Sequence, residues 1–105
     1  MKELKITRSR DEFREYCKIE IERRETGRFA VTIIRGRRLF KADHTVVIGR
    51  GNDLDEAVKE ARDLAAKISH PADGWMSSLL SRAAYDMEIE VEKDLEKAAV
   101  SCPEG

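Results

Sequence analysis

The segment 17–22 reads Cys17-Lys18-Ile19-Glu20-Ile21-Glu22, with apolar and charged side chains in strict alternation. Successive side chains of a β-strand point to opposite faces, so this pattern predicts a strand with one face buried and one in water. Residues 25–28 then supply a turn around a glycine. Residues 29–34 are rich in β-branched side chains and apolar on both faces, which predicts a central strand covered on both sides.

The strand pattern continues outward to residue 48. Gly36 interrupts it within residues 35–38, which favours a hairpin turn, and residues 39–40 and 45–48 are again strand-forming. Residues 41–44 indicate a bulge or a second turn. We therefore expect an antiparallel meander of three or four strands over residues 16–48.

Two helices are predicted after the sheet. Asp53 and Glu56 have the spacing of a capping box, and the apolar spacing that follows predicts an amphipathic helix over residues 53–69. A second apolar stripe predicts a long C-terminal helix over residues 73–99, although residues 87–91 also alternate as a strand would. The expected fold is α+β: an antiparallel three- to four-stranded meander packed by one amphipathic helix, plus the long C-terminal helix.

The first 15 residues carry two competing signals. Leu4 and Ile6 alternate with charged residues and favour a short strand. Ser9 and Glu12 have capping-box spacing, which predicts one or two helical turns after Ser9.

Length and composition are typical of a single folded domain over residues 1–105. Charged residues make up 39% and hydrophobic residues 41% of the 105 residues, which excludes a collagen, a disulfide scaffold and a low-complexity linker. No apolar run is long enough to cross a membrane, and the start of the chain lacks the pattern of a secretory signal. With Cys17 in an apolar pattern and Cys102 near the end, we expect no disulfide framework and a cytoplasmic location.

Charge is unevenly distributed along the chain. Residues 1–50 carry 14 Lys/Arg against 8 Asp/Glu, a net charge of +6, and residues 51–105 carry 6 against 13, a net charge of −7. Either the two halves neutralise each other within one fold, or they form a basic and an acidic surface for partners of opposite charge.

Residue types that carry catalysis are sparse. The two histidines, His44 and His70, have too few neighbouring ligands for a metal site, so we expect no metal and no cofactor. The segment 49–51, Gly49-Arg50-Gly51, lacks the further glycine and the Lys-Ser/Thr pair of phosphate-binding loops, and it favours a plain turn before a helix. The chain is therefore expected not to be an enzyme.

Clusters of charge are the candidate binding sites. Guanidinium groups bind phosphates and carboxylates alike, and a solvated strand edge is the alternative role for such a cluster. The basic hairpin comprises Arg35, Arg37, Arg38, Lys41 and Arg50, while Arg23, Arg24 and Arg28 flank the preceding turn.

The predicted C-terminal helix carries the opposite charge. It is expected to present either a solvated face or a surface that binds protein or imitates nucleic acid, through Asp86, Glu88, Glu90 and Glu92. Trp75, near its start, is expected to pack on the core, or to anchor an interface if it is exposed.

Residues 16–68 resemble a small β-β-β-α module. The element order and the helix entry Gly51-Asn52-Asp53-Leu54-Asp55-Glu56-Ala57 are similar to HicB-type antitoxins and to double-stranded-RNA-binding-like folds. The likeness to HicB-type antitoxins implies a toxin partner. It would often imply a DNA-binding tail as well. In size and charge the chain is also similar to small phage-encoded inhibitors, including anti-CRISPR proteins.

These observations lead to three functional hypotheses. The first is a non-enzymatic binding protein, an inhibitor or antitoxin-like module that docks on a protein or nucleoprotein through charged surfaces. The second is a nucleic-acid-binding module that uses the basic hairpin, with binding that weakens steeply as salt rises. The third is a homodimer built on the C-terminal helix.

Overall fold

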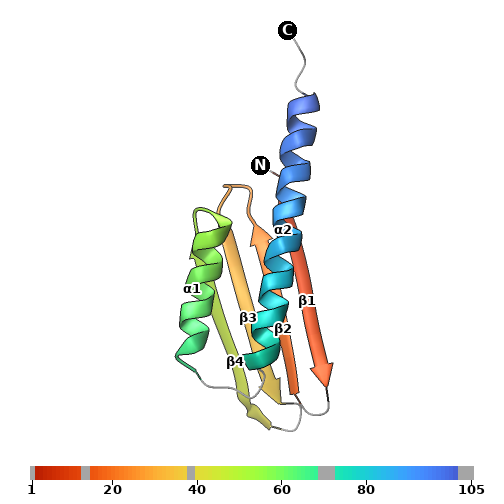
Figure 1. Ribbon diagram of the computed structural model, residues 1–105. Helices are drawn as coiled ribbons and strands as arrows, with labels where there is room; N and C mark the ends of the chain where they lie inside the picture. Colours follow the sequence, from red (N-terminus) through yellow and green to blue (C-terminus); the bar gives the residue numbers. More distant parts are fainter. Residues whose placement is uncertain (1, 13–14, 38–39, 69–72, 102–105) are drawn as a thin grey trace.

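Four antiparallel strands form one sheet whose spatial order follows the sequence (Figure 1). The computed structural model describes residues 2–12, 15–37, 40–68 and 73–101. The elements are β1 (Leu4–Glu12), β2 (Glu15–Arg23), β3 (Phe29–Arg37), β4 (Phe40–Gly51), α1 (Leu54–Ala66) and α2 (Asp73–Ser101). The α+β fold predicted from the sequence, an antiparallel meander followed by two helices, is confirmed.

Both helices lie on the same face of the sheet (Figure 1). Helix α1 covers β3 and β4, and α2 covers β1 and β2 before it runs past the end of the sheet (Figure 1). The expectation that residues 29–34 are covered on both sides is therefore wrong. On the open face Ile34 is half-buried, and Val46 and Ile48 are 48% and 40% exposed. An antiparallel sheet can leave one face to water, because its hairpin connections require no covering helix on that side.

The core lies between the sheet and the helices. Strand β2 contributes alternate residues, with Cys17 buried as the sequence predicted. Burial of each large aliphatic side chain in this layer contributes about 1.5–3 kcal/mol. The fully buried large aliphatic and thioether side chains of the core are Ile19, Ile21, Val31, Ile33, Leu80 and Met87.

Helix α1 packs on β4 through small residues. Its buried face consists largely of Ala57, Ala61 and Ala65. A Cβ atom added to Gly49 of β4 would lie 2.3 Å from the Ala61 backbone nitrogen and 2.5 Å from the Ala57 carbonyl oxygen. Gly49 thus allows the helix backbone to approach the strand backbone directly.

The N-terminal segment is a strand and not a helix. Residues 4–12 pair with β2 along their whole length, from Leu4 opposite Arg23 to Glu12 opposite Glu15. The strand expectation from Leu4 and Ile6 is confirmed, and the helical turns predicted after Ser9 are wrong. The capping-box signal is local, and pairing with β2 together with packing against α2 outweighs it.

The hairpin turn predicted at residues 35–38 is wrong for residues 35–37, which belong to β3, with Gly36 paired to Tyr16 of β2. The meander and the two helices are confirmed with small shifts in their boundaries. Arg35 pairs with Thr45, and the next pair along β3 joins Arg37 to Phe40. From the first pair to the second, β3 advances by two residues and β4 by five, which places a register shift at residues 41–44, where the sequence predicted a bulge or a turn. The carboxylate of Asp53 accepts the Glu56 amide at 2.8 Å and caps α1. Residues 87–91 lie within α2, so the strand alternative is wrong there.

Candidate binding surfaces

Arg35 of the predicted basic hairpin is buried, with 1% of its surface exposed. Its Nη2 donates to the carbonyl oxygens of Ala65 at 3.4 Å and Ile68 at 3.2 Å, at the C-terminal end of α1. A cation is favoured there because the carbonyl end of a helix carries partial negative charge. The Ala65 carbonyl also accepts the Ile68 amide at 3.1 Å. The structure therefore assigns Arg35 a structural role beneath α1 and removes it from any binding surface.

The other members of the basic hairpin do not form one cluster. Arg37 is half-buried and pairs with Phe40 at one end of the sheet, whereas Arg50 is exposed and pairs with Ala30 toward the opposite end. An antiparallel return carries the chain back along the sheet, so Arg50 is separated from the hairpin by about seven residues of strand, roughly 23 Å. Arg38 and the side chain of Lys41 lie outside the described residues.

Arg50 instead joins two arginines of the β2–β3 turn. Arg24, Arg28 and Arg50 line a surface depression of about 370 Å³, together with Phe29, Ala30, Gly51, Asn52 and Glu56. The sequence placed Arg24 and Arg28 beside a turn, but pairing across the sheet was needed to bring Arg50 to them.

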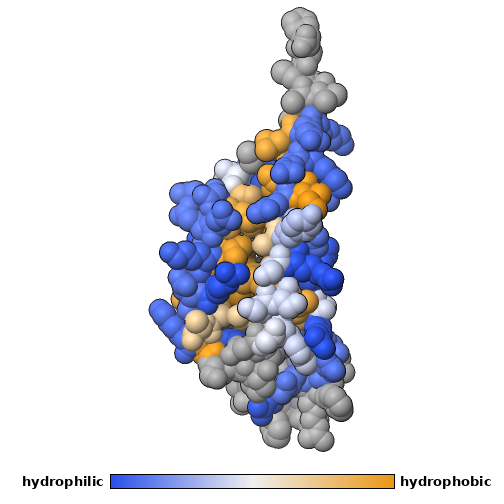
Figure 2. All heavy atoms as spheres, viewed as in Figure 1, coloured by the Kyte–Doolittle hydropathy of each residue, from blue (hydrophilic) through white to orange (hydrophobic). Residues whose placement is uncertain are grey.

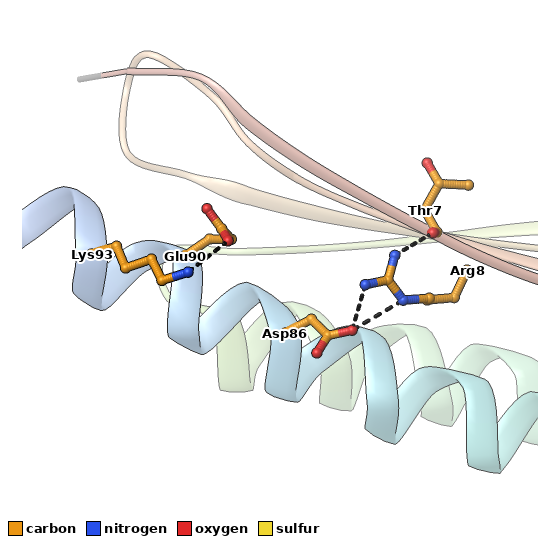
Figure 3. Close-up of polar contacts among 5 residues, drawn as sticks. All are labelled: Thr7, Arg8, Asp86, Glu90 and Lys93. Carbon is orange, nitrogen blue, oxygen red and sulfur yellow. Dashed lines mark hydrogen bonds and ion pairs between the residues drawn. The ribbon is translucent and has the colours of Figure 1, made fainter.

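Two ion pairs join the basic first half of the chain to the acidic second half. Arg8 of β1 donates to Asp86 of α2 at 2.6 and 3.0 Å, and also to the Thr7 carbonyl at 2.8 Å (Figure 3). Arg23, 2% exposed, lies 2.5 Å from Asp94. The Arg23 hydrogen bond, reinforced by its charge, lowers the pKa of Asp94 below its usual value of 3.8 against a smaller opposing effect of desolvation.

These contacts divide the predicted acidic surface of α2. Asp86 is occupied by Arg8, and Glu90 lies 3.7 Å from Lys93 on the same helix (Figure 3). Glu88 and Glu92 are exposed. Four carboxylates were predicted to form a binding surface. Of these, Glu88 and Glu92 line a groove toward α1, and Asp86 and Glu90 do not.

That groove has an apolar floor and an acidic rim. It has a volume of about 310 Å³, and Phe29, Leu54 and Val91 form its apolar lining. The polar lining consists of Asp53, Glu88 and Glu92. Figure 2 shows hydrophobic residues gathered between the two helices, with hydrophilic residues on either side. Sequence analysis identified Glu88 and Glu92, and it treated Asp53 only as a helix cap.

Trp75 packs against the core and is half-buried. The Arg10 guanidinium lies 4.8 Å from the centre of its ring, a cation–π contact between β1 and α2. The expectation that Trp75 packs on the core is confirmed.

The open face of the sheet carries an apolar strip between polar ends. Ile34 pairs with Val46 and Thr32 pairs with Ile48 across β3 and β4. Near one end, the Tyr16 ring covers Gly36 and its hydroxyl contacts Nδ1 of His44. A Cβ on Gly36 would lie 2.5 Å from the Tyr16 hydroxyl, so the glycine leaves room for the ring to cross β3.

Comparison with known proteins identifies no relative of this chain. No family model, no curated protein and no solved structure matches it. Within the described residues, no cluster of three or more side chains suited to holding a metal ion is present. None of the helices in that part of the chain is long and apolar enough to span a membrane.

Proposed function

We propose that the chain is a non-enzymatic binding protein, an inhibitor or antitoxin-like module that docks on a protein partner. The partner contributes a segment that presents aliphatic side chains flanked by lysine or arginine. The docking site is the groove between α1 and α2. This is the first of the three functional hypotheses, with the acidic surface narrowed to Glu88 and Glu92.

The observation that carries this proposal is the composition of the groove. Among the described residues, its lining combines three apolar residues with Asp53, Glu88 and Glu92 and includes no lysine or arginine. An apolar floor supplies most of the affinity in protein interfaces, whereas a rim of one charge selects the partner and speeds its approach.

The outer part of α2 extends the same surface. Met87, Val91 and Leu95 are four residues apart and lie along one stripe, fully buried at Met87 and 56% exposed at Leu95. Helix α2 runs past the end of the sheet (Figure 1), and exposure along the stripe rises from Met87 to Leu95. A partner segment seated in the groove would reach Leu95, which enlarges the contact beyond the groove alone.

A peptide-binding experiment tests this proposal. The probe is a fluorescent amphipathic peptide with leucines on one face and lysines on the other, measured by anisotropy against a peptide with glutamate at every lysine. The tested variant is Glu88→Gln/Glu92→Gln. Its matched control is Glu60→Gln/Asp63→Asn, which removes two exposed carboxylates of α1 that do not line the groove.

We expect the lysine peptide to bind the parent and the glutamate peptide not to bind. The groove variant should lose about tenfold in affinity, equivalent to about 1.4 kcal/mol, and the control should keep the parent value. Leu95→Ser should weaken the same peptide without loss of charge. Equal weakening in the groove variant and in the control would reject the groove as the docking site.

A further inference from the structure

We infer that the depression surrounded by Arg24, Arg28 and Arg50 binds the phosphate groups of a nucleic-acid strand. This arginine depression borders the acidic groove, with Phe29 in the lining of both, but it carries the opposite charge and the inference does not depend on the proposed function. It also differs from the basic hairpin of the second hypothesis, of which it retains only Arg50.

Backbone hydrogen bonds of the β2–β3 turn fix the main chain at two of the arginines. The Arg24 amide donates to the Arg28 carbonyl at 2.8 Å, and the Gly27 amide donates to the Arg24 carbonyl at 2.8 Å. Gly27 has a φ of 87°, a left-handed conformation that glycine adopts at little cost. The turn therefore presents both guanidinium groups from one end of the sheet.

Strand pairing adds the third arginine. Arg50 of β4 lies opposite Ala30 of β3, which is two residues after Arg28 of the turn. Ala30 and Arg50 share the side of the sheet that the helices leave open, because alternate residues of a strand point to the same face. Arg28 lies in the turn just before β3. The depression thus lies at the end of the sheet, between Ala30 and Arg50 of the open face and Glu56 in the first turn of α1.

Within the part of the chain that the structure describes, no ion pair neutralises the charge of this site. Among the residues that the structure describes, Arg8, Arg10 and Arg23 each have a carboxylate partner. None of the three arginines of the depression forms an ion pair within that part of the chain, and Glu56 is the only carboxylate of its lining. Three guanidinium groups against one carboxylate leave a site with a positive charge that an external anion can satisfy.

The chemistry of the site favours phosphate groups of a polymer. Guanidinium groups donate two parallel hydrogen bonds to phosphate oxygens. The arginines are exposed, and exposed cations hold a single small anion weakly in water. Successive phosphates of one strand can engage all three at once, and release of their counterions adds affinity. Next to Arg50, Ile48 and Val46 offer exposed apolar contact for sugars and bases.

The test measures binding of labelled oligonucleotides across a salt series. The probes are a 20-nucleotide single-stranded DNA, the RNA of the same sequence and the DNA duplex. The site variant is Arg24→Gln/Arg28→Gln/Arg50→Gln. The matched control, Lys59→Gln/Arg62→Gln/Arg82→Gln, removes three exposed cations of the helices. Thermal unfolding of each variant, and the single change Arg50→Gln, guard against a loss caused by misfolding.

We expect the parent to bind an oligonucleotide, and the site variant to bind at least about tenfold more weakly at low salt. The slope of log affinity against log salt should become shallower by about 2, as expected for three lost contacts to a single strand. The control should keep most of the affinity at low salt and most of the salt dependence of the parent. The variant Glu88→Gln/Glu92→Gln should bind nucleic acid as the parent does, which separates this site from the acidic groove.

Four outcomes would overturn the inference. The first is no binding of any oligonucleotide at low salt, and the second is equal loss in the site variant and the control. The third is binding of inorganic phosphate alone, seen as chemical-shift changes without any oligonucleotide binding. The fourth is equal competition by polyglutamate of the same charge, which would assign the arginines to a carboxylate-bearing protein surface.

Discussion

Arg23, the last residue of β2, forms an ion pair with Asp94 of α2, with 2.5 Å between Nη2 and Oδ2. The same guanidinium donates to the Lys2 carbonyl at 2.7 and 3.2 Å, so it ties the N-terminal segment and α2 to the sheet. Arg23 is buried, and these two partners stabilise its charge in the interior.

This ion pair makes the stability of the folded protein depend on pH in the acidic range. The folded protein holds the pKa of Asp94 below the usual 3.8, so the contribution of the pair is fully present above that value. It is lost as pH falls below 3.8 and Asp94 takes up a proton. We expect Asp94→Asn to lower the melting temperature at pH 7, and the difference from the parent to shrink as pH falls toward 2. Thermal melts across that range measure it, and a difference independent of pH would contradict the assignment.

The approach of α1 to β4 predicts an unequal response of two glycines to alanine. Gly49→Ala places a Cβ against the backbone of α1 and should destabilise by about 1–3 kcal/mol. Gly74→Ala in α2 is the control, because a Cβ there meets nothing within 4 Å. It should leave stability unchanged or raise it by about 0.5–1 kcal/mol. Urea unfolding of both variants gives the comparison, and equal effects would contradict close packing at Gly49.

The buried position of Arg35 separates stability from binding. Arg35→Met keeps much of the side-chain volume but leaves the carbonyls of Ala65 and Ile68 without this donor, at a cost of about 1–3 kcal/mol. Arg50→Met at an exposed position should change stability by no more than about 0.5 kcal/mol. For oligonucleotide binding we expect the opposite: Arg50→Met should weaken binding, and Arg35→Met should not. A stable Arg35 variant with lost nucleic-acid binding would restore the basic hairpin as a site.

The charge of the acidic groove bears on the homodimer hypothesis. Two copies that meet groove to groove would bring Glu88 and Glu92 of each toward the same carboxylates of the other, and like charges repel. We expect a monomer in light scattering at neutral pH. A dimer that persists in the parent and dissociates in Leu95→Ser would instead support association through α2.

The helix cap offers a measure of local stability near the groove. Asp53 accepts the Glu56 amide and begins α1, so Asp53→Ala should cost about 1 kcal/mol of unfolding free energy. Asp53→Ser should recover most of that loss, because serine also caps helices. If Asp53→Ser restores stability but not affinity for the lysine peptide, the carboxylate charge contributes to the groove separately from capping.

Much of the fold is encoded in local patterns. The alternation in residues 17–22 identifies β2 and its buried face, and the capping residue Asp53 identifies the start of α1. The long apolar stripe identifies α2 despite the alternation of residues 87–91. These signals are readable because burial of one face imposes a period of 2 on a strand and 3.6 on a helix.

Other features depend on contacts between segments far apart in the chain. The pattern of residues 9–12 favours a helix locally, and only pairing with β2 makes that segment a strand. The apolar outer face of β3 does not reveal that both helices pack on the opposite side.

The candidate sites show the same division. Composition supplied an excess of arginine in the first half of the chain and of carboxylate in the second, together with the hypothesis that such charges meet partners. Only the tertiary structure shows which of these charges are available. Arg23 and Arg35 are buried, and Arg50 lies at the end of the sheet opposite to the hairpin with which the sequence analysis grouped it. A charged side chain carries no local sign of whether it will be buried with a partner or left in water, because its partners come from distant segments brought together by burial of the apolar core.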